Sequence, residues 1–110
     1  MKIVIPSTSE NLTSPVSDTL GRAPFLIFYD SSDGSYESVE NPGFQVQDGS
    51  GLEASKTLLE NNADVLLTKE IGRKSYSLLL KEHIKIELIK SGETVKSALS
   101  KYFKKQRKKN

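Results

Sequence analysis

The chain has 110 residues, of which 35% are hydrophobic and 27% charged, and a formal charge of +2, which is typical of a single globular domain. It contains no cysteine and one histidine, which excludes disulfide bonds, thiolate catalysis and cysteine-ligated zinc or iron–sulfur sites. No apolar run approaches the roughly 20 residues that span a bilayer, and Pro6 ends the first apolar run too early for a signal peptide, so we expect a cytoplasmic protein.

The first half of the chain predicts three strands separated by polar loops. Residues 3–5 form a short β-branched run that ends at Pro6, which is typical of a buried strand. Residues 25–29 carry apolar side chains on both faces, and a polar turn ending in Gly34 joins them to residues 35–40. The pattern of residues 35–40 indicates an edge strand with one polar face.

The hydrophobic period changes to helical spacing at Gly51. Residues 51–62 have apolar side chains at helical intervals and are predicted to form the first helix. A continuous apolar run follows at residues 65–68. Such a run is typical of a strand that is covered on both faces, and so it requires helices on both sides of the sheet.

Gly72 is predicted to begin the second helix. The apolar face of this helix is expected to contain Tyr76, Leu79 and Leu80. Residues 84–88 then alternate between apolar and polar side chains, as a further strand does.

The last helix is predicted to begin near Gly92, and its apolar stripe contains Val95, Leu99 and either Tyr102 or Phe103. The resulting order is three strands, then helix, strand, helix, strand and helix. Strands that alternate with helices need parallel crossovers, whereas the first hairpin makes one strand antiparallel. The chain is therefore predicted to be a three-layer α/β sandwich, with a mixed sheet between helices on both faces.

Positive charge is concentrated at the C-terminus. Residues 101–110 contain six of the sixteen basic residues and no acidic residue, which leaves residues 1–100 with a net charge of −4. We therefore predict one domain over residues 1–103 and a basic tail over residues 104–110 that frays from the last helix. The tail either keeps the chain solvated and complements the helix dipole, or contacts an acidic protein, a membrane surface or, weakly, nucleic acid.

Several short motifs occur in the order and spacing of one known family. They are Ile3-Val4-Ile5-Pro6, Ser14-Pro15-Val16-Ser17-Asp18, Gly21-Arg22-Ala23-Pro24, Gly49-Ser50-Gly51 and Thr68-Lys69-Glu70-Ile71-Gly72. With them, residues 1–103 resemble the dinitrogenase iron-molybdenum cofactor biosynthesis family of nitrogenase accessory carriers. The resemblance implies a ribonuclease H-like motif with a five-stranded sheet in the order 3-2-1-4-5 and strand 2 antiparallel. It also implies a non-catalytic module that carries an iron–sulfur or iron-molybdenum cofactor or its precursor.

The chain departs from that family at two places. Many members have His-Phe just before the Gly-Arg pair, where this chain has Thr19 and Leu20, and that histidine is the candidate ligand of the cluster. The neutral hydroxyl of threonine is a poor ligand for soft iron. His83 stands where members usually have glycine, and its place at a helix end indicates a capping or surface role.

An anion site is predicted at the carboxyl edge of the sheet, where two helices begin. In the implied strand order, this edge contains the switch point at which open α/β sheets bind ligands. Free N–H groups and the positive dipole ends of the helices suit phosphate, molybdate or a negatively charged cluster. The residues expected to bind it are Ser7, Thr19, Gly21, Arg22, Gly49, Gly51, Thr68, Lys69 and Gly72, and no side chain is expected to ligate a metal.

The same residues also fit a plainer interpretation. The glycines make tight turns, with Gly21 adopting a positive φ, and the basic side chains are solvated. Arg22 either holds an oxyanion through two hydrogen bonds or pairs with Asp18 across the turn.

We expect no enzymatic activity, because the sequence contains no catalytic constellation. A two-metal nuclease needs several carboxylates on its central strands, and residues 2–6 contain none. The single histidine excludes a serine triad, and Gly49-Ser50-Gly51 lacks the lysine and third glycine of phosphate- and dinucleotide-binding loops. The chain is thus predicted to carry an anionic ligand, or to be an interaction protein that kept the fold, lost the cluster site and acts through its surface or basic tail.

Overall fold

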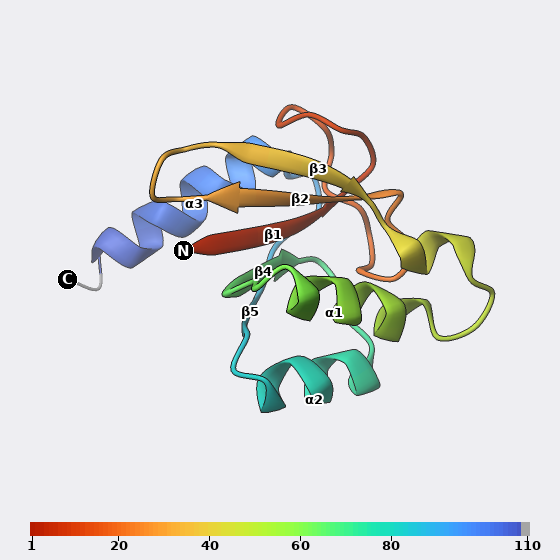
Figure 1. The fold of residues 1–110 in the computed structure, drawn as a ribbon. Coiled ribbons are helices and arrows are strands. Elements are labelled where there is room, and N and C mark those ends of the chain that lie inside the picture. Colours follow the sequence, from red (N-terminus) through yellow and green to blue (C-terminus); the bar gives the residue numbers. More distant parts are fainter. Residues whose placement is uncertain (109–110) are drawn as a thin grey trace.

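A computed structural model describes residues 1–108 and arranges them as one sheet with helices on both faces (Figure 1). The elements in chain order are β1 (Lys2–Ser7), β2 (Phe25–Asp30), β3 (Tyr36–Glu40), the 3-10 helix η1 (Pro42–Gln45), α1 (Ser50–Glu60), β4 (Val65–Thr68), α2 (Arg73–Lys81), β5 (Lys85–Leu88) and α3 (Val95–Lys108). None of the helices within residues 1–108 is both long enough and apolar enough to cross a lipid bilayer.

The sheet has five strands in the order β3-β2-β1-β4-β5. The central strand β1 runs antiparallel to β2 and parallel to β4, which is in turn parallel to β5. Because β3 is antiparallel to β2, only β2 runs against the other strands. The predicted strand order, and the α/β fold class with it, are confirmed.

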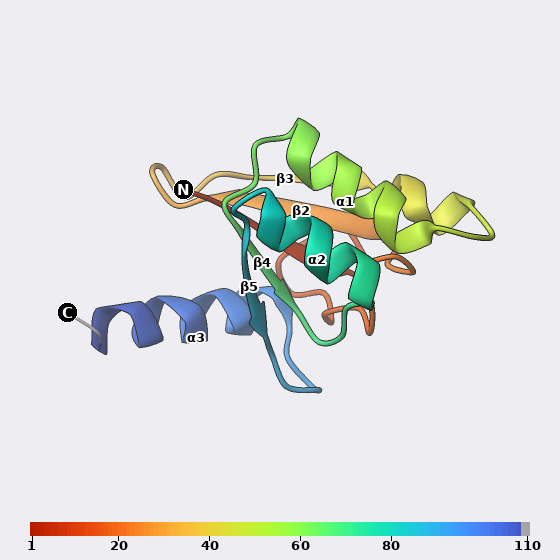
Figure 2. The same ribbon diagram turned by 90° about the horizontal axis from the view of Figure 1, so that it is seen from below.

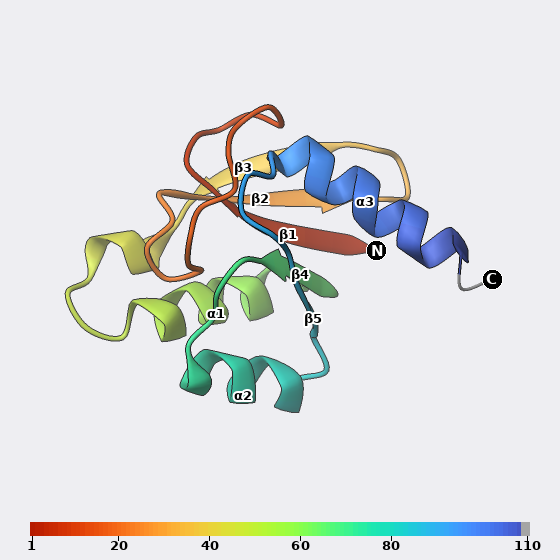
Figure 3. The same ribbon diagram turned by 180° about the vertical axis from the view of Figure 1, so that it is seen from behind.

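Each face of the sheet has its own apolar core, because successive side chains of a strand point to opposite faces. Ile3, Ile5 and Leu67 belong to the core beneath α3, whereas Val4 and Leu66 belong to the core beneath α1 and α2. Figures 2 and 3 show the two layers: α1 and α2 lie on one face and α3 crosses the other. This double cover explains why the central strands are continuously apolar.

The apolar face of α2 differs from the prediction. Leu79 is fully buried, but Tyr76 and Leu80 are 43% and 47% exposed, and Ser75 lies on the buried side instead. The helix is rotated so that the Ser75 side chain packs against Gly51 of α1. Helical spacing identified a set of neighbouring side chains, but the contact with α1 decides which of them faces the sheet. Leu88 is also exposed, because β5 is an edge strand.

The C-terminal helix is longer than predicted. Instead of fraying after Phe103, α3 continues through Lys108, while Lys109 and Asn110 lie outside the described residues. Lys105 forms an ion pair with Glu87, at 3.0 Å between Nζ and Oε2, which ties the predicted tail to β5. Tyr102, rather than Phe103, occupies the core position.

The first turns of α3 are fixed by Glu93. Hydrogen bonds donated by the Lys101 ammonium and then by the Ser97 hydroxyl hold the pKa of the Glu93 carboxyl below its usual range. The ionised carboxylate therefore favours the folded state at neutral pH, and this contribution is lost as the pH falls through the lowered pKa.

His83 ends α2 in a left-handed conformation, with φ at 65°. Its N–H donates to the carbonyl of Leu80, and the N–H of Ile84 donates to the carbonyl of Leu79. This pair of bonds is the Schellman motif, whose left-handed residue is most often glycine. The motif gives His83 the structural end-of-helix role that its position indicated.

Replacing His83 with glycine is expected to raise the free energy of unfolding by about 1 kcal/mol. A left-handed residue with a Cβ costs about 1–2 kcal/mol, and part of the gain is lost to the greater backbone freedom of glycine in the unfolded chain. Urea denaturation measures the change. Asn62→Gly is the control, because Asn62 ends α1 with φ at 57° but asparagine tolerates this region, so its gain should be smaller. An unchanged or lower midpoint for His83→Gly would contradict the strain at this position.

Candidate functional site

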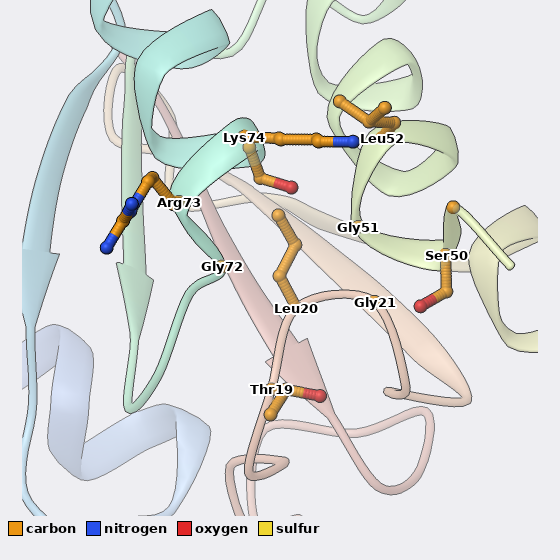
Figure 4. A pocket seen from close by; sticks show the side chains of 11 residues that line it. Thr19, Leu20, Gly21, Ser50, Gly51, Leu52, Gly72, Arg73 and Lys74 are labelled. Carbon is orange, nitrogen blue, oxygen red and sulfur yellow. The ribbon is translucent and has the colours of Figure 1, made fainter.

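A pocket of about 440 Å³ lies at the edge of the sheet where β1, β3 and β4 end. Three segments line it: residues 19–21 from the loop entering β2, residues 49–52 at the start of α1, and residues 72–75 at the start of α2. Figure 4 shows these segments facing one another, with Leu20 between the two helices. The strand order therefore brings together the N-termini of two helices that are distant in the sequence.

The structure places five of the nine predicted site residues in the wall of this pocket. They are Thr19, Gly21, Gly49, Gly51 and Gly72. The other four do not line it. They are Ser7, Arg22, Thr68 and Lys69.

Ser7 and Thr68 are buried residues that shape turns at the ends of their strands. The Ser7 hydroxyl donates to the carbonyl of Ser9 at 2.6 Å, and the Thr68 hydroxyl donates to that of Glu70 at 3.1 Å. Both residues are 0% exposed. Their hydroxyl protons are thus committed to the backbone, which explains why neither residue reaches the pocket.

The long side chains of Arg22 and Lys69 brace the loops around the pocket. Arg22 donates through Nη2 to the carbonyl of Gln47 at 2.7 Å, which fixes the segment before α1. Lys69 pairs with Asp18 at 2.9 Å and joins the β4–α2 loop to the loop that enters β2. The predicted pairing of Arg22 with Asp18 is therefore wrong, because the neighbouring loop supplies Asp18 with a different cation.

Two glycines allow the pocket walls to touch. A Cβ on Gly21 would lie 2.5 Å from the Ser50 hydroxyl and 2.6 Å from the backbone nitrogen of Gly51. A Cβ on Gly51 would lie 2.5 Å from the hydroxyl of Ser75. Gly21 does not have the positive φ that we expected, so close approach of the chain is the reason for glycine there. Gly49, in contrast, does have a positive φ, at 73°.

At Gly72, neither close approach of another segment nor a positive φ requires glycine. Its φ of −71° is accessible to any residue, and a Cβ there would meet nothing within 4 Å. Serine, threonine, aspartate or asparagine at this N-cap position would stabilise α2 through a side-chain hydrogen bond. Glycine instead leaves the first amides of the helix uncovered on the pocket side.

The electrostatics of the pocket suit an anion. Neither α1 nor α2 has a side-chain cap, so the first N–H groups of both helices lack an intrahelical or capping acceptor. The lining residues include Arg73 and Lys74 but no carboxylate. Figure 4 shows the Lys74 side chain reaching toward Leu52 of α1, while Arg73 points away from the other lining residues. Lys74 is therefore the lining cation whose side chain extends across the pocket toward α1.

Asn41, which no sequence motif singles out, links the loop that enters β2 to the segment that follows β3. Asn41 is 1% exposed, and its Nδ2 donates to the carbonyls of Leu20 and Ala23, both at 2.9 Å. Its Oδ1 accepts from the N–H of Gly43 at 3.0 Å. An asparagine before Pro-Gly indicates a turn, but the pattern does not reveal that the amide is buried between two loops. Ser50, Lys74 and Ser75 were also missed, since no motif distinguishes them from surface residues.

The residues present do not fit an iron–sulfur cluster that side chains ligate directly. The chain has no cysteine. Its one histidine follows the last turn of α2, about 14 Å along the helix from the pocket. Across residues 1–108, no three histidine, aspartate or glutamate side chains are grouped as a metal site would require. The N–H and O–H donors do fit an anionic group that is held by hydrogen bonds.

Comparison with solved structures finds the same fold in other proteins. The apo form of the orange protein from Desulfovibrio gigas has a TM-score of 0.89 and 27% identity, over 96% of this chain and 88% of that one. A Thermotoga protein of the DUF35 family has a TM-score of 0.81 and 29% identity, over 94% of this chain and 87% of that one. No curated protein sequence matches. The family model described as dinitrogenase iron-molybdenum cofactor matches residues 1–105, so the chain belongs to that cofactor-related family.

Proposed function

We propose that this domain is a non-catalytic cytoplasmic carrier that holds an anionic cofactor, or the precursor of one, in the pocket between α1 and α2. The observation that carries the proposal is the convergence of two uncapped helix N-termini beside Lys74. Helix dipoles and the ammonium charge attract an anion, and no lining carboxylate opposes it. Membership of the cofactor family supports a cofactor as the ligand, as does the similarity to a protein described in its apo form.

The chain's part in this function is binding and orientation. A metal-containing group would bring its own redox chemistry, while the amides of α1 and α2 hold its outer atoms and Lys74 balances its charge. The apolar side chains of Leu20 and Leu52 line the same pocket and keep part of it away from water. No covalent bond from a side chain is required.

Molybdate, phosphate or sulfate is expected to raise the melting temperature of the wild-type protein. A ligand that binds only the folded chain stabilises it by mass action. Lys74→Gln should reduce the shift by about half or more, because it removes the charge that faces the pocket. Lys81→Gln is the matched control, since it removes an exposed charge at the opposite end of α2 and should leave the shift unchanged. Anaerobic reconstitution with iron and sulfide should give little bound iron and little visible absorption.

The proposal fails if none of the three anions shifts the melting temperature. It also fails if Lys74→Gln and Lys81→Gln reduce the shift equally, because the effect would then be one of net charge. Stable uptake of iron and sulfide would contradict holding by hydrogen bonds alone.

A second candidate function is that of an interaction protein, and the basic end of α3 favours it. Residues 94–110 contain seven basic residues and no acidic one. Lys104 and Arg107 are exposed and take part in no ion pair within the described residues. This surface suits an acidic protein. Two results together would favour this function over the first. The protein would bind polyglutamate in a salt-sensitive way that is lost when both residues become glutamine, and anions would not shift its melting temperature.

A further inference from the structure

The outer edge of β5 offers backbone groups to a further strand. β5 is the last strand of the sheet, and within residues 1–108 its outer side pairs with no other strand (Figure 1). Lys85 and Ile89 donate their N–H groups to carbonyls of β4 and of the residue before it. In a parallel ladder, the residues between these donors turn their backbone groups the other way. The N–H and C=O groups of Ile86 and Leu88 therefore point outward, away from β4.

Exposed apolar side chains border this edge on the face that α2 covers. Leu88 is 64% exposed and points to the same face as Ile86, which packs against the core beneath α1 and α2. Tyr76 and Leu80, one turn apart on α2, are 43% and 47% exposed. They lie on the opposite flank of the helix from Lys74, whose side chain reaches toward α1. Tyr76 and Leu80 are therefore on the side of α2 that faces the β5 edge.

The other face of β5 carries one charge of each sign. The Lys85 ammonium lies 5.4 Å from the centroid of the Tyr102 ring in α3, and the Glu87 carboxylate pairs with Lys105 of the same helix. Both side chains thus lie on the α3 face of the strand, with 3.7 Å between Lys85 Nζ and Glu87 Oε1. An apolar face and a face of two opposite charges make β5 complementary to a second copy of itself.

We propose that two copies of this chain pair through β5, antiparallel and about a two-fold axis at Ile86, so that their sheets become continuous. In this register, Lys85 of each copy lies opposite Glu87 of the other, and Ile86 lies opposite Ile86. The outward backbone groups of the two Ile86 residues exchange hydrogen bonds. On the α2 face, the apolar border of each copy meets that of the other.

Charge selects both this register and this edge of the sheet. An axis at Glu87 would place two carboxylates directly opposite each other, which is destabilising. The other edge strand, β3, carries Glu37 and Glu40 and no basic residue, so two copies of β3 would repel each other. β5 contains no proline, and its two charges cancel. It therefore lacks the features with which edge strands commonly avoid pairing.

The association is expected to be weak, because β5 has only four residues. We expect a dissociation constant between about 1 μM and 1 mM, as for a small and transient interface. Sedimentation velocity over this range of concentrations measures it. The sedimentation coefficient of the wild type should rise from that of a monomer to that of a dimer and then stop, because two-fold pairing occupies both β5 edges.

Charge reversal tests the register. Lys85→Glu places acidic side chains opposite each other in the paired strands, and Glu87→Lys places basic ones opposite each other, so each variant alone should bind itself at least about tenfold more weakly. An equimolar mixture of the two should dimerise, because every contact then joins opposite charges. Lys56→Glu and Glu60→Lys are the matched control, since these exposed residues of α1 undergo the same changes of charge. Each control variant should dimerise as the wild type does, and mixing them should add nothing.

Leu88→Pro tests the edge itself. Proline removes an N–H group that points outward and leaves the hydrogen bonds to β4 intact, so the monomer should fold but no longer dimerise. Leu88→Ile keeps both the N–H group and an apolar side chain, and should still dimerise. Circular dichroism and the melting temperature in dilute solution, where the wild type is also monomeric, verify that each variant folds.

Several results would overturn the inference. The first is a wild type that stays monomeric at about 1 mM. The second is a dimer that persists in folded Leu88→Pro, or in both charge-reversal variants measured alone. Growth beyond a dimer would mean that β5 pairs with a different surface of the second copy. None of these results bears on the anion pocket, which is tested by melting-temperature shifts, so the two proposals fail independently.

Discussion

Leu66→Ala is expected to lower the free energy of unfolding by about 3–5 kcal/mol, the largest loss that we predict for one side chain. Leu66 is 0% exposed, lies on β4 next to the central strand, and belongs to the core that α1 and α2 cover. Truncation removes apolar contacts from both the sheet and the helices. It leaves a cavity that a strand paired on both sides cannot collapse to fill. Urea denaturation followed by circular dichroism measures the change.

Leu88→Ala is the matched control for this prediction. Leu88 is 64% exposed at the end of the edge strand β5, so the same truncation should change stability by about 0.5 kcal/mol or less. A wild-type denaturation midpoint for Leu66→Ala would mean that this core packs loosely. Equal losses for the two leucines would contradict the assignment of β5 to the edge.

The strands were predictable because short apolar runs in the sequence indicate which strands are buried. A β-branched run at residues 3–5 and a continuous apolar run at residues 65–68 both require cover on two faces, and in the structure they pair as β1 and β4 at the centre of the sheet. The family resemblance added the strand order, which local patterns alone do not specify. Residues 104–108 behaved differently from the prediction, because a run of lysines is compatible with helix when the preceding turns are already anchored.

The outline of the site was predictable, but the roles of its side chains were not. Helix starts at glycines are visible in the sequence, and the topology then brings them to one edge of the sheet. The partners of long or polar side chains depend on loops that are distant in the chain. Lys69 forms an ion pair with Asp18, and Arg22 donates a hydrogen bond to the carbonyl of Gln47. Asn41 and Ser75 matter because of burial that arises only when the loops pack together.

Glycine is required at only some positions around the pocket, and a pair of alanine variants separates the two kinds. Gly21→Ala is expected to cost about 3 kcal/mol, the upper part of the usual range for overpacking. Its Cβ would lie 2.6 Å from the nitrogen of Gly51 and 2.8 Å from the carbonyl carbon of Ser50. These are backbone atoms at the start of α1, so relief requires the loop and the helix to separate. The melting temperature should fall and the pocket should open.

Gly72→Ala is expected to leave stability within about 0.5 kcal/mol of the wild type, because alanine is a poor N-cap but restricts the unfolded chain. Its methyl group enters open space beside the exposed amides of α2, where we place the bound anion. The stable Gly72→Ala protein should therefore lose most of its melting-temperature shift with molybdate. Full retention of that shift would mean that the anion does not approach the start of α2. A Gly21→Ala protein as stable as the wild type would show instead that the loop entering β2 does not press on α1, so that the two pocket walls are not held by contact at Gly21.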